Sequence, residues 1–201
     1  IYQKLNDNYQ SRLIYVGAGT SGRIGVQDGV ELYPTFGWPK KRVGFVIAGG
    51  KNALLESIEG VEDDITKAKI DSKKIKINKN DVLLALAASG NTPFTNEVIS
   101  IAKDLNALTI AISNNPNGII LEKADYKILL NTGPEVLTGS TRLKAGTAQK
   151  ICLNMISTLV MGKLGRIKDG QMTHLVTTNK KLIERKIRIE KRLKNKKNYK
   201  N

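Results

Sequence analysis

Short runs of aliphatic residues alternate along the chain with longer segments in which apolar residues recur every three or four positions. The short runs predict five strands, at Arg12–Val16, Val43–Ala48, Val82–Ala87, Leu108–Ile112 and Tyr126–Leu130. The longer segments predict helices, at Ser21–Leu32, Ala53–Ala68, Pro93–Leu105, Asn117–Ala124 and Arg142–Leu164. Because strands and helices alternate, we expect an α/β fold in which helices flank both faces of a doubly wound, five-stranded parallel sheet.

The organisation of the chain follows from where this alternation stops. No internal repeat or low-complexity linker divides residues 1–166, which we expect to form one domain, and residues 167–201 are expected to form a C-terminal helical arm with a basic tail. The arm begins as an amphipathic helix and loses its aliphatic residues after Leu193, which predicts a frayed end. The chain starts at Ile1 in what reads as the last turns of a helix, so we expect a trimmed chain.

The composition is that of a globular protein, with 40% hydrophobic and 25% charged residues among 201. The net charge of +15 invites a nucleic-acid interpretation, but residues 180–201 carry +9 of it. We therefore favour a solvated basic end and do not expect nucleic-acid binding; retention on nucleic acid that falls steeply with salt would indicate the alternative.

Other residue counts narrow the class further. Cys152 is the single cysteine, which rules out an intramolecular disulfide and disfavours a thiolate zinc site. The longest apolar stretch, between Lys150 and Lys163, is shorter than the roughly 18 residues that a membrane-spanning helix needs. No secretory leader pattern is present, so we expect a cytoplasmic protein without a membrane span. His174, the only histidine, has no partner motif that would indicate catalysis.

Glycine-rich loops follow three of the predicted strands. They are Gly17–Arg23, Ala48–Gly50 and Ala88–Pro93. Two of them add hydroxyl groups, from Thr20, Ser21, Ser89 and Thr92. Open parallel sheets bind ligands beyond the carboxyl ends of their strands, where backbone N–H groups and hydroxyls suit phosphate oxygens. Each loop alone is equally consistent with simple helix capping and turn formation, but two of them in one sheet favour a small sugar phosphate.

The sequence around the first glycine-rich loop disfavours both a dinucleotide-binding site and a P-loop. Gly17, Gly19 and Gly22 satisfy the G-x-G-x-x-G pattern, but a dinucleotide site also requires an acidic residue about 20 positions further on. No Asp or Glu occurs from Leu32 through Leu55, and no loop ends in the Gly-Lys-Ser/Thr of a P-loop. We therefore expect no nucleotide cofactor.

Several segments together resemble one family. They are Ile14–Arg23, Pro34–Gly37, Ile47–Gly50, Glu59–Asp64, Ala87–Pro93 and Gly133–Lys150. Over about Leu13 to Arg188 the sequence resembles the N-acetylmuramic acid 6-phosphate etherases, lyases of the SIS (sugar isomerase) fold that share ancestry with the glucokinase regulatory protein. The resemblance implies a homodimer that splits N-acetylmuramate 6-phosphate into N-acetylglucosamine 6-phosphate and D-lactate during cell-wall recycling, with no metal or redox cofactor.

The same resemblance assigns roles to individual residues. The acid–base glutamate before the Pro-Thr-Phe-Gly element is Glu31, and a second active-site glutamate in the EGVEDD segment is Glu62. Taken alone, the first would be a solvated helix end and the second part of a charged surface. The phosphate and substrate residues implied are Gly19, Thr20, Ser21, Gly22, Ser89, Gly90, Asn91, Thr92 and Lys144. Glu135, Ser140, Thr141 and Arg142 are further candidates for approaching the substrate.

The etherase reaction needs only proton transfers. The lactyl ether lies β to the aldehyde carbon of the open-chain sugar, so removal of the C2 proton permits elimination, and water then adds across the double bond. Two features depart from the family pattern: Asn91 replaces the arginine common in the third-strand loop, and the family's terminal helical regions are nearly absent. The alternatives are a noncatalytic sugar-phosphate regulator resembling the glucokinase regulatory protein, and a phosphosugar isomerase.

Overall fold

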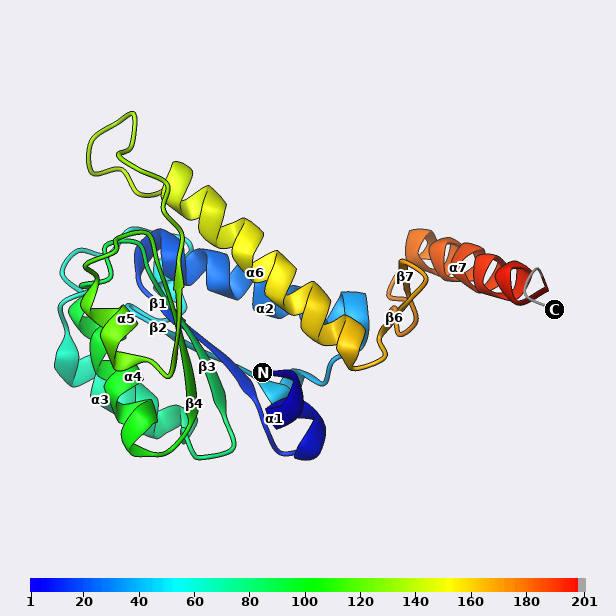
Figure 1. The fold of residues 1–201 in the computed structure, drawn as a ribbon, viewed down its shortest axis with the longest axis horizontal. Helices are drawn as coiled ribbons and strands as arrows, with labels where there is room; N and C mark the ends of the chain where they lie inside the picture. Colours follow the sequence, from blue (N-terminus) through cyan, green and yellow to red (C-terminus); the bar gives the residue numbers. More distant parts are fainter. Residues whose placement is uncertain (199–201) are drawn as a thin grey trace.

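Five parallel strands form the central sheet of the computed structural model, which describes residues 1–198 (Figure 1). They are β1 (Leu13–Gly17), β2 (Val43–Ile47), β3 (Val82–Ala87), β4 (Leu108–Ser113) and β5 (Tyr126–Leu129). The strand order is β2-β1-β3-β4-β5, so the chain steps from β1 outward to β2 and then crosses to the other side of β1. The predicted doubly wound parallel sheet is confirmed, and its switch point lies between β1 and β3.

Helices cover both faces of this sheet (Figure 1). They are α1 (Tyr2–Asp7), α2 (Gly19–Phe36), α3 (Ile65–Ile75), α4 (Pro93–Asp104), α5 (Ile119–Lys123) and α6 (Lys144–Lys163), with short 3-10 turns at Lys40–Arg42 and Asn52–Leu54. Helices α3, α4 and α5 pack into one apolar core and α1, α2 and α6 into the other. All residues of β1 and β3 are buried, which explains their continuous aliphatic character.

The predicted helix at Ala53–Ala68 is wrong. Only the turn at Asn52–Leu54 is helical there, and α3 begins at Ile65, where the Asp64 carboxylate caps it by accepting the Lys67 N–H at 2.7 Å. The segment between them leaves Leu55 92% exposed and bends at Gly60, whose φ of 72° is left-handed. As a result Glu62 lies in a loop and not on a helix face.

The helix after the first loop is longer than predicted. α2 continues past Leu32 to Phe36 and ends at Gly37, whose left-handed φ of 60° closes the helix. Glu31 therefore lies within α2 and does not end it. At mid-helix the buried Asp28 carboxylate accepts hydrogen bonds from Tyr15 Oη (2.7 Å), Asn154 Nδ2 (2.8 Å) and Ser157 Oγ (3.0 Å), so α2, α6 and β1 are locked together.

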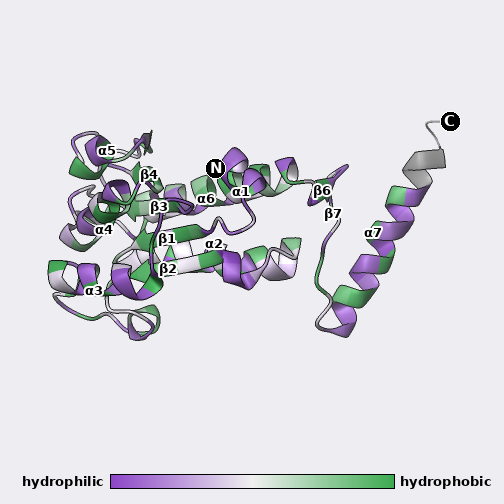
Figure 2. Ribbon diagram, turned by 90° about the horizontal axis from the view of Figure 1, so that it is seen from below, coloured by the Kyte–Doolittle hydropathy of each residue, from purple (hydrophilic) through white to green (hydrophobic). Residues whose placement is uncertain are grey.

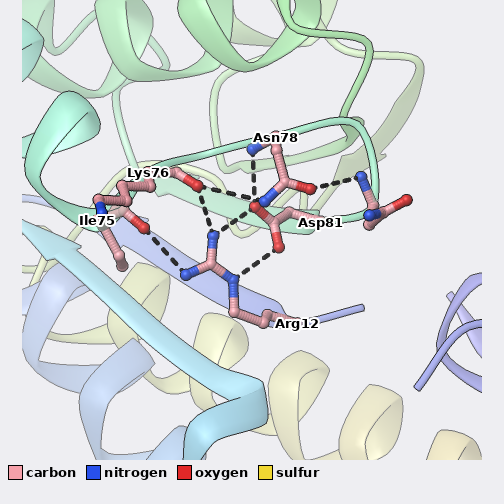
Figure 3. Close-up of polar contacts among 6 residues, drawn as sticks. Arg12, Ile75, Lys76, Asn78 and Asp81 are labelled. Carbon is pink, nitrogen blue, oxygen red and sulfur yellow. Dashed lines mark hydrogen bonds and ion pairs between the residues drawn. The ribbon is translucent and has the colours of Figure 1, made fainter. Parts of the chain in front are cut away.

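At the opposite edge of the sheet from the carboxyl strand ends, Arg12 joins three elements (Figure 3). Its guanidinium makes a two-point ion pair with the fully buried Asp81, at 2.8 and 2.7 Å, and donates to the carbonyls of Ile75 and Lys76 at the end of α3. The hydrogen bond to Asp81 raises the pKa of Arg12. This network fixes the amino ends of β1 and β3 and leaves their carboxyl ends for the loops.

The C-terminal arm stands away from the sheet (Figures 1 and 2). A small hairpin, β6 (Ile167–Lys168) and β7 (Gln171–Met172), leads to α7 (Lys180–Asn198), and Ile189 of α7 is buried beside β7. The helix runs past Leu193, further than expected, and the last three residues of the predicted frayed tail, 199–201, lie outside the described residues. The division into 1–166 and 167–201 stays a prediction. Within residues 1–198, no helix combines the length and hydropathy needed to cross a membrane.

Candidate functional site

A cavity of about 410 Å³ opens at the carboxyl edge of the sheet, where the loops after β1 and β3 meet. Its lining consists of Ala18, Gly19, Thr20, Ser21, Glu62, Asp63, Ala88, Ser89, Asn91, Thr92, Pro93, Gly139 and Thr141. Seven of the site residues proposed from the sequence line this cavity together: Gly19, Thr20, Ser21, Glu62, Ser89, Asn91 and Thr92. Glu31, Gly22, Gly90 and Lys144 are outside this lining.

Two helices begin at the cavity. In α2 the first intrahelical bond runs from the Gly22 N–H to Ala18 O, so the N–H groups of Gly19, Thr20 and Ser21 precede the helical ladder. The α2 N-cap is Ala18, which has no capping side chain, and neither α2 nor α4 carries an acidic residue in its first turn. Both helices therefore direct their positive ends toward one space, an arrangement that suits an anion.

The loop after β3 supplies the second set of donors. The Asn91 N–H donates to Ser89 Oγ at 3.2 Å, and Asn91 Oδ1 accepts the Ile119 N–H at 3.1 Å, which ties the loop to the start of α5. Thr92 is the N-cap of α4 but makes no side-chain capping bond, so its hydroxyl is available to a ligand. Asn91 thus supports the loop through its carbonyl oxygen while its amide NH₂ has no acceptor within residues 1–198.

Two predicted glycines act through close packing and not by lining the cavity. A Cβ on Gly22 would lie 2.9 Å from Gly17 O, so α2 starts in contact with the end of β1. Gly90 has a φ of 73°, and a Cβ there would collide with the Cα of Gly118. A side chain at either position would push a loop out of place.

The acidic part of the lining comes from the loop between β2 and α3. The side chains of Glu62 and Asp63 are solvent-exposed, and the Glu62 carbonyl accepts the Phe94 N–H of α4 at 2.9 Å. This bond holds Glu62 beside the N-terminus of α4. A carboxylate that can transfer a proton therefore lies in the same cavity as the anion-binding groups.

The lining residues that the sequence analysis did not propose are Asp63 and Gly139, together with Ala18, Ala88 and Pro93 of the two glycine-rich loops. Asp63 directly follows Glu62 in the EGVEDD segment, and this adjacency could have indicated that Asp63 also lines the site. Gly139 lies in the irregular segment 131–143, which also brings Thr141, one of the candidates from the sequence, into the lining. A long loop gives no periodicity from which such an approach can be predicted.

Glu31 lies far from the cavity of its own chain. It is exposed and follows Gly19 by twelve residues along α2, a rise of about 18 Å at roughly 1.5 Å per residue. Lys144, the first residue of α6, has an exposed side chain, and its backbone N–H is bound to Glu135 Oε2 at 2.9 Å. Neither side chain reaches the cavity in a single chain.

Glu135 caps α6 from within the segment that contributes Gly139 and Thr141 to the cavity. Its carboxylate accepts the N–H groups of Ala145 and Lys144, each at 2.9 Å, and these bonds hold its pKa below the ordinary value. The resulting stabilisation is present above the unfolded carboxyl pKa of about 4.3 and is lost as the pH falls through the lower folded value. We expect Glu135→Gln to lower the Tm at pH 7, with a smaller difference from wild type near pH 3. A thermal scan against pH measures this; an equal decrease in Tm for Glu184→Gln, an exposed glutamate of α7, would contradict it.

Sequence comparison relates most of the chain to proteins of known name. The model of the glucokinase regulatory protein N-terminal SIS domain matches residues 1–103. An N-acetylmuramic acid 6-phosphate etherase of Staphylococcus saprophyticus is 50% identical over 178 residues, which cover 89% of this chain and 60% of that protein. One of Lactobacillus gasseri is 52% identical with the same coverage, and one of Deinococcus radiodurans is 47% identical over 89% of this chain and 58% of its own length. The chain thus spans about 60% of the length of these relatives.

Solved structures share the fold at much lower identity. An Escherichia coli protein superposes with a TM-score of 0.61 and 14% identity, over 83% of this chain and 78% of that chain. A Methanococcus jannaschii protein, whose structure infers a 3-hexulose-6-phosphate isomerase function, gives 0.57 and 20%, over 88% and 85%. The Vibrio vulnificus NanR protein complexed with ManNAc-6P gives 0.52 and 13%, over 81% and 51%. These similarities show the fold alone.

Proposed function

The chain belongs to the family of the glucokinase regulatory protein N-terminal SIS domain, and from this premise we propose that it is an N-acetylmuramic acid 6-phosphate etherase, a carbon–oxygen lyase. Identities of 47–52% to proteins of that name over 89% of the chain support the proposal. The observation that carries it is the cavity itself, in which two helix N-termini meet the carboxylate of Glu62.

The phosphate of the substrate binds between the loops after β1 and β3. The N–H groups of Gly19, Thr20 and Ser21 and the hydroxyls of Ser89 and Thr92 are its donors in this proposal. The NanR protein, which shares the fold, is complexed with ManNAc-6P, and this supports a sugar phosphate as the small-molecule partner. Helix N-termini stabilise such an anion by about 0.3–1 kcal/mol each, and the hydroxyl hydrogen bonds add to this.

Proton transfer at C2 and at the lactyl oxygen is the chemistry that the glutamates provide. A carboxylate removes the C2 proton, which is acidic because C2 is adjacent to the C1 aldehyde, and the C3–O bond breaks so that D-lactate leaves with its ether oxygen. Water then adds at C3 and a proton returns to C2, which gives N-acetylglucosamine 6-phosphate. A positioned acid or base contributes about 10²–10⁴-fold to such steps, and none of them requires a metal or a redox cofactor.

A second copy of the chain completes the site in this proposal. On α6 the side chains of Ile151, Met155 and Leu159 form a stripe that is 52, 58 and 65% exposed, unusual for three large apolar residues on one helix face. Asp28 of α2 contacts Asn154 and Ser157, so Glu31 lies level with the far half of α6. In this proposal the two copies pack their stripes with the α6 helices antiparallel about Met155, which carries the partner's Glu31 toward this cavity.

The cytoplasm is the compartment we assign to this reaction. A charged sugar phosphate does not cross membranes unaided, and Cys152 is a single cysteine that burial keeps as a thiol by raising its pKa.

A noncatalytic regulator is the second candidate, because the matching family model is named for the glucokinase regulatory protein. The two candidates differ in turnover. Incubation with N-acetylmuramate 6-phosphate should release D-lactate, measured with D-lactate dehydrogenase. Binding of the sugar phosphate without D-lactate release would contradict the etherase proposal and favour the regulator, whereas a ketose phosphate product would favour an isomerase.

Removing one hydroxyl from the phosphate site should weaken substrate binding. We expect Thr92→Val to raise KM about tenfold or more with little change in kcat, because a hydrogen bond to a charged group contributes about 1.5–3 kcal/mol and 1.4 kcal/mol is about a factor of ten. Steady-state kinetics measure this, with the exposed Thr66→Val of α3 as the matched control. An unchanged KM in both Thr92→Val and Ser89→Ala would contradict the phosphate assignment.

A further inference from the structure

The loop that carries Glu62 is largely exposed in its middle stretch. Between β2 and α3 it runs through residues 48–64, in which Ala53 is buried but Leu55 is 92% exposed and Glu56, Glu59 and Gly60 are exposed. Hydrophobic burial therefore anchors the loop near Ala48, Ala53 and Val61, and leaves the exposed stretch between Ala53 and Val61 to be held mainly by hydrogen bonds.

Arg23 makes the side-chain hydrogen bonds that hold the first half of this loop. Its Nε donates to Ala53 O at 2.9 Å and its Nη2 donates to Glu56 O at 2.8 Å. The two carbonyls are three residues apart, so one planar guanidinium fixes both the position and the direction of the loop as it leaves the 3-10 turn at Asn52–Leu54. At the other end, the Phe94 N–H fixes the Glu62 carbonyl.

A hollow lies between these two attachment points. A second cavity of about 110 Å³ is bordered by Arg23, by Ile58, Gly60 and Val61 of the loop, and by Gly19 and Glu62, which also line the main cavity. Because this cavity separates the loop from α2, the distance between the loop and α2 depends on the hydrogen bonds at the two ends of the loop.

Arg23 also belongs to the element that begins the phosphate site. It lies four residues after Gly19, one turn further along α2, and so directly beneath the N–H groups that precede the helical ladder. The helix that receives the phosphate is therefore the same helix that restrains the acidic loop.

We infer that Arg23 is a positioning residue, which sets the Glu62 carboxylate at a fixed distance from the bound phosphate by clamping the Ala53 and Glu56 carbonyls. The inference rests on the proposed function for the role of Glu62. Its guanidinium acts on the loop and not on the substrate, so its loss changes catalysis more than binding. A misplacement of about 1 Å in a catalytic group can cost about a hundredfold in rate.

The test compares Arg23→Gln, Arg23→Lys and Arg23→Ala with wild type. We expect Arg23→Gln to lower kcat at least about tenfold with KM within about threefold, and Arg23→Lys to lower it less, because an ammonium reaches one carbonyl at a time. Guanidinium at millimolar concentration should restore part of the kcat of Arg23→Ala and none of the kcat of Glu62→Gln. Lys51→Gln, an exposed cation in the same loop, is the control for loss of charge.

Amide hydrogen exchange gives a readout that is independent of turnover. Peptides covering residues 53–63 should exchange faster in Arg23→Gln than in Lys51→Gln, while the sheet stays protected. Wild-type kcat in Arg23→Gln, or unchanged exchange of that loop, would overturn the inference. A wild-type chain that releases no D-lactate contradicts the proposed function instead, and the exchange experiment then decides the role of Arg23 by itself.

Discussion

Glu62→Gln should reduce D-lactate release from N-acetylmuramate 6-phosphate by about a hundredfold or more and leave KM close to the wild-type value. The amide keeps the shape of the side chain but cannot take or give a proton at the reacting carbons. The helix N-termini and hydroxyls of the phosphate site are unchanged, so the sugar phosphate still binds. Steady-state kinetics together with calorimetric titration of N-acetylglucosamine 6-phosphate separate the two effects.

Glu122→Gln is the matched control for this substitution, because Glu122 is an exposed glutamate of α5 outside the cavity lining. It should show wild-type kinetics. Substantial turnover by Glu62→Gln would contradict an acid–base role for Glu62. A loss of binding as large as the loss of turnover would indicate that Glu62 holds the substrate and does not react with it.

The Glu31→Gln variant should also release almost no D-lactate. Part of the activity should return when this variant is mixed with the Glu62→Gln variant. In a dimer whose sites each combine Glu62 of one chain with Glu31 of the other, a mixed dimer contains one intact site and one site with both substitutions. Random exchange of equal amounts therefore restores about a quarter of the wild-type activity. Unfolding and refolding the mixture, followed by the D-lactate assay, measures the recovery.

We expect activity to recover in the mixture because Glu31 and Glu62 are far apart within one chain. Glu31 lies about 18 Å along α2 from Gly19, too far to share its own cavity with Glu62. No recovery in the mixed sample, with each variant dimeric by light scattering, would contradict the shared site. Full activity of Glu31→Gln by itself would remove Glu31 from the mechanism altogether.

Much of the sheet was predictable because its central strands are buried on both faces. In β1 and β3 every residue is buried, so each reads as a continuous aliphatic run that ends where a glycine loop begins. The loops then identified the cavity, since the carboxyl ends of β1 and β3 adjoin in the sheet.

The acidic loop was not predictable in the same way. The spacing of Ala53, Ala68 and the apolar residues between them suggests a helix, but Gly60 takes a left-handed conformation and Leu55 points to solvent. The bonds of Arg23 to two backbone carbonyls leave no trace in the sequence, because any residue supplies a carbonyl. The distance of Glu31 from the cavity follows from its place twelve residues along α2, which the predicted helix at Ser21–Leu32 already implied, although that prediction ended the helix four residues too early.

The position of the new oxygen atom tests the central claim most directly. The reaction is run on N-acetylmuramate 6-phosphate in ¹⁸O-labelled water, and both products are analysed by fragmentation mass spectrometry. Elimination followed by hydration predicts unlabelled D-lactate, which keeps the ether oxygen, and N-acetylglucosamine 6-phosphate labelled at C3. Label in the lactate with none at C3 would show cleavage on the lactyl side of the ether oxygen and would contradict the account.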